Sequence, residues 1–222
     1  MPDPQILGMG GYADDALLEH ALGLARGTRV LYVPTAIAEN TADTVLWYDR
    51  LRGRAELTHL SFFPWPAPDL RGLALAQDVI LVSGGNTANA LAIWRVHGFD
   101  AILREAWKQG IVLAGSSAGM ICWFEAGITD SFGPQLEGMR DGLGFLPGSA
   151  CPHYDAEERR RPVYQELVAS GFPAGLAADD GVGLHFVGTE LKEPVSVREG
   201  ANAYRVEDGG ETTIEARQLE KE

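Results

Sequence analysis

Residues 111–119 read IVLAGSSAG, an apolar run that stops at five small residues. A continuous apolar run bounded by turn residues is typical of a strand buried on both faces of a sheet. The small residues predict a sharp turn, and the run MICWFEAG at 120–127 predicts a helix after it. This stretch therefore predicts a buried strand, a tight turn and a helix in direct succession.

The same order occurs upstream. The run DVILVS at 78–83 predicts a second buried strand, and GGNT at 84–87 predicts a turn that opens a helix. Further strands are expected at 5–7, 29–34 and 55–63, and helices at 14–25, 42–51 and 99–109. Alternating strands and helices indicate a mostly parallel sheet with helices on both faces, so the predicted fold class is α/β, a three-layer α/β/α arrangement.

The second half of the chain is less regular. Residues 127–152 are rich in Gly, Pro and Asp and predict loops that carry function. A helix is expected at 156–171, and the strand-like runs at 183–187, 194–199 and 201–209 predict a hairpin or meander at the sheet edge. Residues 211–222 are expected to fray as a tail.

Composition bounds the class of protein. The 222 residues, 45% hydrophobic and 22% charged, predict a single globular domain over 1–222. The net charge of −13 disfavours nucleic acid and anionic membrane surfaces as partners. Because the first residues lack signal-peptide features, we expect a cytoplasmic protein. Cys122 and Cys151 do not form a CxxC pattern, so neither a disulfide framework nor a metal site is expected.

The segment Gly115 to Gly119 satisfies G-x-S-x-G, in which a strained strand-to-helix turn exposes the central serine hydroxyl. Ser117 is therefore a candidate nucleophile. The following helix would direct its positive N-terminal dipole at a developing oxyanion. Five small residues alone also fit a structural turn, and the strand before them favours the catalytic interpretation.

A serine nucleophile needs a base, and histidine is the usual one. His153 lies in CPHYD, within the loop-rich region downstream of Ser117. The other four histidines lie in expected helices or strands, where ordinary surface or core roles are more common. These are His20, His59, His97 and His185.

Three ordered segments resemble the peptidase E family of serine peptidases, which are aspartyl dipeptidases and relatives, with cyanophycinase more distant. They are VSGGNT at 82–87, AGSSAG at 114–119 and CPHYD at 151–155. The resemblance spans most of the chain. It implies a class I glutamine amidotransferase-like (flavodoxin-like) fold in which serine replaces the cysteine nucleophile, and it favours a homodimer.

The resemblance also implies roles. Ser117 would attack the scissile carbonyl, His153 would act as general base, and the N–H groups of Gly85 and Ala118 would form the oxyanion hole. Asn86, in the GGN turn, is expected at the substrate site and also fits a helix N-cap.

The acid that orients His153 is open between two candidates. Asp130, 13 residues after Ser117, matches the acidic position of peptidase E with slightly different spacing and is the first choice. Asp180, 27 residues after His153, resembles the position of a Glu in cyanophycinase-like relatives and is the second. The acid must hydrogen-bond the ring nitrogen that faces away from Ser117.

The chain departs from aspartyl dipeptidases after the PH segment, because their longer stretch ending in a substrate-reading Arg is absent. Arg159, Arg160 and Arg161 follow much sooner, and one of them is a candidate for clamping a substrate carboxylate, although a solvated helix face explains them equally well. A requirement for an N-terminal aspartyl residue therefore stays open.

The expected function is hydrolysis of dipeptides or short peptides through an acyl-enzyme, without metal or organic cofactor. The alternatives are a cyanophycinase-like or β-aspartyl peptide hydrolase and a non-catalytic binding domain on the same fold. Nucleotide binding by GMGG at 8–11 is disfavoured, since the GxGxxG spacing is missing.

Overall fold

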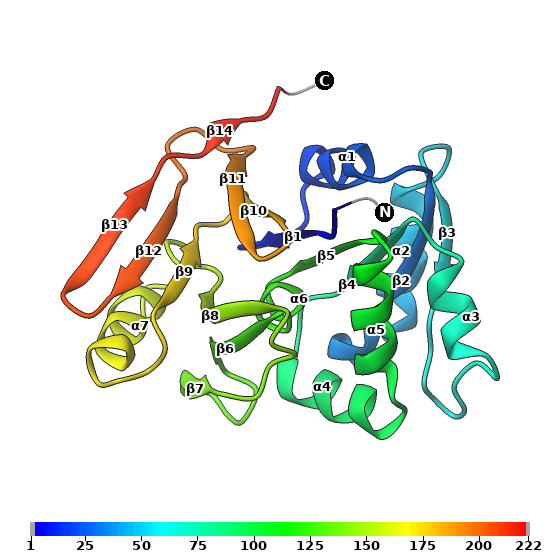
Figure 1. The fold of residues 1–222 in the computed structure, drawn as a ribbon, viewed down its shortest axis with the longest axis horizontal. Coiled ribbons are helices and arrows are strands. Elements are labelled where there is room, and N and C mark those ends of the chain that lie inside the picture. Colours follow the sequence, from blue (N-terminus) through cyan, green and yellow to red (C-terminus); the bar gives the residue numbers. More distant parts are fainter. Residues whose placement is uncertain (1–2, 221–222) are drawn as a thin grey trace.

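The computed structural model describes residues 3–220 and contains two β-sheets (Figure 1). The first has eight strands in the order β14-β11-β10-β1-β5-β4-β2-β3. Its strands are β1 (Gln5–Met9), β2 (Arg29–Val33), β3 (Glu56–His59), β4 (Val79–Val82), β5 (Val112–Ser116), β10 (Val182–Val187), β11 (Glu190–Ser196) and β14 (Arg217–Gln218). The neighbouring strands in the run β1-β5-β4-β2-β3 pair in parallel, whereas β10 pairs antiparallel with β1 and with β11.

Helices cover both faces of this sheet, which confirms the predicted three-layer α/β/α class. Successive residues of β2 and β4 pack into two different hydrophobic clusters, one on each face of the sheet, because side chains along a strand point to opposite faces in turn. One face packs on α1 (Asp15–Leu24) and α2 (Thr41–Arg50). The other packs on α3 (Leu70–Leu75), α4 (Thr87–Val96), α5 (Phe99–Lys108) and α6 (Ala118–Ile121). A short 3₁₀ helix, η1 (Pro34–Ile37), follows β2.

The second sheet was not predicted. It has six strands in the order β13-β12-β9-β8-β6-β7, and α7 (Arg160–Ala169) covers its outer face (Figure 1). The strands are β6 (Phe124–Thr129), β7 (Glu137–Met139), β8 (Leu146–Cys151), β9 (Gly175–Ala178), β12 (Ala203–Glu207) and β13 (Gly210–Ile214). The largest hydrophobic cluster contains side chains from both sheets, so the sheets share a core.

Three expectations about elements are wrong. The helix expected over 120–127 ends at Ile121, because residues from Phe124 onward join the second sheet. The region 127–152 contains β7 and β8 as well as loops. The tail forms β13 against β12 and β14 against β11, since these strands complete sheet edges, so it is not frayed at 211–214 or 217–218. Residues 221–222 lie outside the described range.

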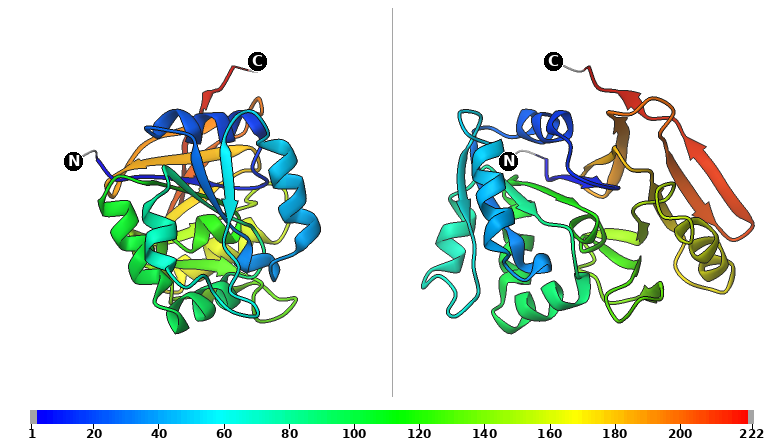
Figure 2. Two further views of the ribbon diagram at one scale, coloured as in Figure 1. Left: turned by 90° about the vertical axis from the view of Figure 1, so that its right-hand side faces the viewer. Right: turned by 180° about the vertical axis from the view of Figure 1, so that it is seen from behind.

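The views in Figure 2 show α1 and α2 on one side of the first sheet and α7 with the second sheet at the far end of the molecule. Over residues 3–220, every helix is too short or too polar to cross a lipid bilayer.

Candidate active site

Ser117 sits at the sharp turn between β5 and α6, with φ 54° and ψ −108°. The neighbouring glycines are required by the crowding of this turn. A Cβ on Gly115 would lie 2.4 Å from the Gly119 carbonyl oxygen, and one on Gly119 would lie 2.6 Å from the Val82 carbonyl oxygen. The five small residues therefore form a strained strand-to-helix turn, as the motif predicts.

His153 follows β8 in the second sheet and also has a positive φ, 54°. Its backbone N–H donates to the Gly10 carbonyl at 2.7 Å, and the Ser117 N–H donates to the Met9 carbonyl at 3.0 Å. The carboxyl end of β1 thus holds the backbones of both residues, one from each sheet.

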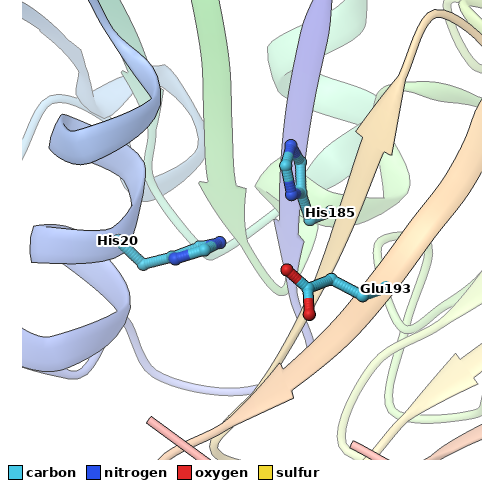
Figure 3. Close-up of side chains that lie close together, drawn as sticks. All are labelled: His20, His185 and Glu193. Carbon is cyan, nitrogen blue, oxygen red and sulfur yellow. The ribbon is translucent and has the colours of Figure 1, made fainter. Parts of the chain in front are cut away.

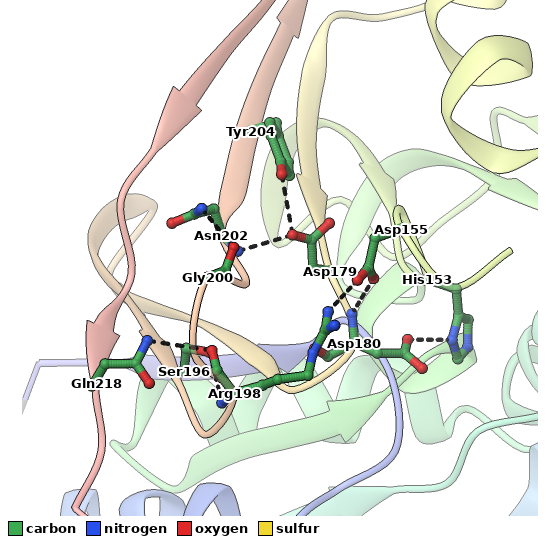
Figure 4. Close-up of polar contacts among 10 residues, drawn as sticks. All are labelled: His153, Asp155, Asp179, Asp180, Ser196, Arg198, Gly200, Asn202, Tyr204 and Gln218. Atoms are coloured by element: carbon green, nitrogen blue, oxygen red, sulfur yellow. Dashed lines mark hydrogen bonds and ion pairs between the residues drawn. The ribbon is translucent and has the colours of Figure 1, made fainter. Parts of the chain in front are cut away.

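The side chains of Ser117, His153 and Asp180 form a continuous hydrogen-bonded chain. His153 Nε2 lies 2.9 Å from Ser117 Oγ, and His153 Nδ1 lies 2.7 Å from Asp180 Oδ1. The His153 side chain is only 14% exposed, so most of the imidazole ring is withdrawn from solvent. Figure 4 shows the Asp180 carboxylate pointing at the imidazole ring. This is the geometry of a serine, its base and an orienting acid.

Asp180 lies in the turn between β9 and β10, where the chain passes from the second sheet to the first. Its N–H donates to Asp155 Oδ1 at 2.9 Å, and Arg198 Nε donates to its carbonyl at 3.1 Å (Figure 4). Arg198 also pairs with Asp155. Burial alone would raise the pKa of Asp155, but the hydrogen bonds from the Asp180 N–H and Arg198 outweigh it and lower the pKa.

The neighbouring Asp179 is buried beneath this turn. Its Oδ2 accepts from the Asn202 N–H at 2.9 Å and from the Tyr204 hydroxyl at 3.1 Å (Figure 4). Desolvation raises the pKa of Asp179 above its usual value of 3.8. Asp179 therefore anchors the turn from inside while Asp180 faces the histidine.

The glycines of GMGG make room for this site, a role that sequence reasoning missed. A Cβ on Gly10 would lie 2.5 Å from the Asp179 carbonyl oxygen, and one on Gly11 would lie 2.3 Å from Asp180 Oδ1. The position of these glycines directly after the first strand could have indicated this role. Side chains there would block the close approach of the β9–β10 turn.

A cavity of about 400 Å³ opens beside Ser117 and His153. Its charged lining includes Asp43, Glu157 and Arg50, whose guanidinium donates to Asp15 and to the Ala13 carbonyl. The Asp43 carboxylate accepts a hydrogen bond from the Tyr32 hydroxyl. Burial and this carboxylate raise the pKa of Tyr32, which keeps the phenol protonated as a donor.

The two predicted oxyanion groups come from the turn after β4 and from the start of α6, and of the two residues Gly85 lines the cavity. Gly85 has φ 120°, and a Cβ there would lie 2.3 Å from the Ala36 carbonyl oxygen. Ala118 directly follows Ser117 as the first residue of α6. Within residues 3–220, neither the Gly85 N–H nor the Ala118 N–H donates to a backbone carbonyl. Both N–H groups therefore lack a backbone acceptor in the described part of the chain, as the donors of an oxyanion hole must.

Two predicted residues, Asn86 and Asp130, do not line this cavity. Asn86 caps α4, since its Oδ1 accepts from the Asn89 N–H at 2.9 Å, while its Nδ2 donates to the Ser131 carbonyl at 2.9 Å. Its amide is thus engaged in structure rather than directed at a substrate. Asp130, the first-choice acid, is exposed at the end of β6, and both ring nitrogens of His153 already have other partners. The expected contact between Asp130 and His153 is therefore wrong.

The arginines after the PH segment do not line the cavity. Arg160 is 3% exposed and pairs with Glu157 at 2.6 Å, because α7 turns this side chain into the second sheet. Arg159 is exposed at the start of α7. Neither is placed to clamp a substrate carboxylate beside Ser117, which corrects that expectation.

Both cysteines are buried free thiols in different hydrophobic clusters. Desolvation raises the pKa of Cys122 and of Cys151. They are therefore protonated packing residues.

Comparison with known proteins gives consistent matches. The sequence model of Peptidase family S51 matches residues 7–193. The chain is 49% identical over 180 residues to the uncharacterized peptidase YgaJ of Bacillus subtilis (strain 168), covering 80% of this chain and 77% of that protein.

Two solved structures share the fold. The crystal structure of a peptidase from an acI-B1 Actinobacterium has a TM-score of 0.72 at 18% identity, covering 96% of this chain and 95% of that one. A protein of Listeria monocytogenes EGD-e assigned to peptidase E has a TM-score of 0.66 at 18% identity, covering 88% of this chain and 98% of that one.

Proposed function

The chain belongs to peptidase family S51 and is a peptidase, and we propose that it cleaves short peptides through an acyl-enzyme on Ser117. The observation that carries the proposal is the chain of hydrogen bonds from Ser117 Oγ through His153 to Asp180. A hydroxyl with a base at 2.9 Å and an acid behind that base is the arrangement an activated serine requires.

Each group has a chemical step. Ser117 Oγ attacks the scissile carbonyl while His153 Nε2 takes its proton, and the imidazolium then protonates the leaving amine. Asp180 accepts the hydrogen bond from Nδ1–H, which fixes the ring orientation and stabilises the imidazolium. The N–H groups of Gly85 and Ala118 stabilise the tetrahedral oxyanion. A water molecule, activated by His153 in the same way, then hydrolyses the ester on Ser117.

The cavity supports a substrate with a free amino terminus. Asp43 and Glu157 line a space of about 400 Å³, sized for a short peptide, and carboxylates favour a protonated amine. The guanidinium of Arg50 is already paired with Asp15. We therefore propose selection by the substrate amino group rather than by an aspartyl side chain.

The nucleophile is tested with Ser117→Ala, and with Ser116→Ala as the matched control because Ser116 also lines the cavity. We expect Ser117→Ala to lose turnover by about 10³-fold or more with an unchanged circular dichroism spectrum. A fluorophosphonate probe should label the native protein and Ser116→Ala but not Ser117→Ala. Unchanged peptidase activity in Ser117→Ala would refute the serine mechanism. A native protein that neither cleaves peptides nor reacts with the probe would favour a non-catalytic binding domain.

Substrate selection is tested with a panel of free and N-acetylated dipeptides, including β-aspartyl peptides. We expect cleavage of the free dipeptides, and a KM for them that rises about tenfold in Asp43→Asn with little change in kcat. Equal cleavage of N-acetylated peptides would contradict recognition of the amino group, and exclusive cleavage of β-aspartyl peptides would replace it with that specificity.

A further inference from the structure

Three side chains with metal-ligand chemistry converge outside the active-site cavity. His20 comes from α1, His185 from β10 and Glu193 from β11, and Figure 3 shows them pointing toward one another. Ligand atoms of the three residues lie within 4.8 Å of one another. His185 and Glu193 are directly opposite in the antiparallel β10–β11 pair, so the strand register itself brings them together.

Two ring nitrogens of this cluster are buried without a hydrogen-bond partner. They are His20 Nε2 and His185 Nδ1. His185 is only 7% exposed, so its free nitrogen is withdrawn from bulk water. Buried polar atoms are almost always satisfied, and an unpaired one in a folded protein points to a missing water or ion.

The surrounding hydrogen bonds determine which nitrogen of His185 carries the lone pair. Gln5 Nε2 donates to the Leu24 carbonyl at 3.2 Å, which turns Gln5 Oε1 toward the ring. His185 Nε2 lies 2.9 Å from this oxygen and must therefore donate to it. Nδ1 is then the unprotonated nitrogen, able to bind a cation. A metal-binding histidine usually has such a carbonyl on its other nitrogen.

The Glu193 carboxylate is paired with Arg217 but keeps acceptor capacity for a cation. Arg217 Nε and Nη2 donate to Oε2 and Oε1 at 2.7 and 3.0 Å, which leaves each oxygen a second lone pair.

We propose that His20, His185 and Glu193 form a binding site for a divalent transition-metal ion, with Zn²⁺ as the best fit. Two imidazoles and one carboxylate are ligands that Zn²⁺ accepts, with bonds of about 2.0–2.2 Å and water in the fourth position. The three side chains must draw together slightly from their present spacing. Gln5 is a positioning residue that orients His185.

The role of the site follows from its place in the fold. It joins α1 to the β10–β11 edge of the first sheet, and none of its residues lines the cavity beside Ser117. Bound metal would therefore stabilise the folded state without entering the peptidase reaction, since a ligand that binds only the native state raises its stability.

The experiment measures Zn²⁺ binding by calorimetry and thermal unfolding in the His153→Ala background, which removes binding at the active-site histidine. We expect one equivalent of Zn²⁺, a rise in Tm with Zn²⁺ concentration, and visible absorption bands from bound Co²⁺ in a four-coordinate site. His20→Ala and Glu193→Gln should each weaken Zn²⁺ binding by at least about tenfold, and Gln5→Leu by about 10- to 100-fold.

The matched control is His59→Ala, which removes an exposed histidine from β3 and should leave Zn²⁺ binding unchanged. Each variant is compared only if its metal-free circular dichroism spectrum matches that of the parent. Absence of Zn²⁺ binding in the parent, or equal binding in parent, His20→Ala and Glu193→Gln, would overturn the proposal, and water would then explain the unpaired nitrogens.

Discussion

Ser117 and His153 both have φ 54°, a region that side-chain-bearing residues rarely adopt. Such a conformation costs on the order of 1–3 kcal/mol and persists only where surrounding structure imposes it. Here the carbonyls of Met9 and Gly10 hold the two backbones. Both residues proposed to perform the chemistry therefore have strained backbones, and Ala38 and Glu39 are the other side-chain-bearing residues with positive φ within residues 3–220.

This strain predicts the stability of two inactive variants. Ser117→Gly should be more stable than Ser117→Ala by about 1 kcal/mol, because only glycine adopts φ 54° and ψ −108° without steric cost. Urea unfolding of the two variants measures the difference. Equal stability would mean that the turn is not strained.

The acid assignment gives a second prediction. Asp180→Asn should lower kcat by about 10³- to 10⁴-fold, because the amide stabilises neither the needed tautomer of His153 nor the imidazolium. Asp130→Asn is the matched control and should keep native kcat, since Asp130 is exposed and His153 is engaged elsewhere. The reverse pattern in steady-state kinetics would restore Asp130 as the acid.

A third prediction concerns the space beside Asp180. In Gly11→Ala the new Cβ would lie 2.3 Å from Asp180 Oδ1 and displace the carboxylate, so we expect kcat to fall by about 10²-fold. The control is Gly23→Ala on α1, where a Cβ meets nothing within 4 Å. It should retain activity and gain about 0.5–1 kcal/mol in urea unfolding. Native kcat in Gly11→Ala would show that the carboxylate tolerates the displacement.

Sequence reasoning reached part of this site. Ser117 and His153 could be predicted because each lies in a segment with a recognisable local pattern. The choice between Asp130 and Asp180 could not, because it depends on how the β9–β10 turn folds back on β1 from the other sheet. The contact between His20 and His185 was missed for the same reason, since these residues are far apart in the chain.

At the scale of elements, the alternation of strands and helices predicted the first sheet. The second sheet was not predicted, because two of its strands consist largely of small residues. β8 and β9 contain Gly, Ala and Ser, which read as loop. Their strands are crowded, however: a Cβ on Gly175 would lie 1.9 Å from the Ser149 carbonyl oxygen. Small residues are therefore needed for tight packing in these strands, and side-chain propensity does not reveal it.

The early end of α6 at Ile121 was also not predictable from the local sequence. Its apolar continuation fits a helix as well as a strand, and periodicity does not separate the two over so few residues. Pairing of β6 with β7 and β8 decides the outcome. The chain leaves the Ser117 turn, makes one helical turn and enters the sheet that also carries His153.

At the scale of the whole molecule, paired carboxylates set the response to acid. Arginines lower the pKa of Asp78, Glu105 and Glu193, so each carboxylate binds protons less readily in the folded state. A lowered pKa contributes stability that is present above the unfolded value, about 4, and is lost as pH falls through the folded value. The raised pKa of Asp179 acts in the opposite direction.

Because carboxylates with a lowered pKa outnumber Asp179, whose pKa is raised, we expect Tm to fall as pH drops from about 4.5 to 3. Asp78→Asn, which removes the partner of Arg29, should flatten part of this decline. Thermal unfolding across a pH series measures both. A constant or rising Tm over that interval would contradict the expectation.

The two carbonyls at the end of β1 have a consequence for how the protein loses activity. The nucleophile belongs to one sheet and its base to the other, and these carbonyls hold them in register. Turnover therefore depends on the two sheets being packed against each other, and not only on each sheet being folded. Under gradual denaturation, inactivation should precede loss of far-ultraviolet circular dichroism, and a small separation of the sheets would act as a reversible off state before unfolding begins.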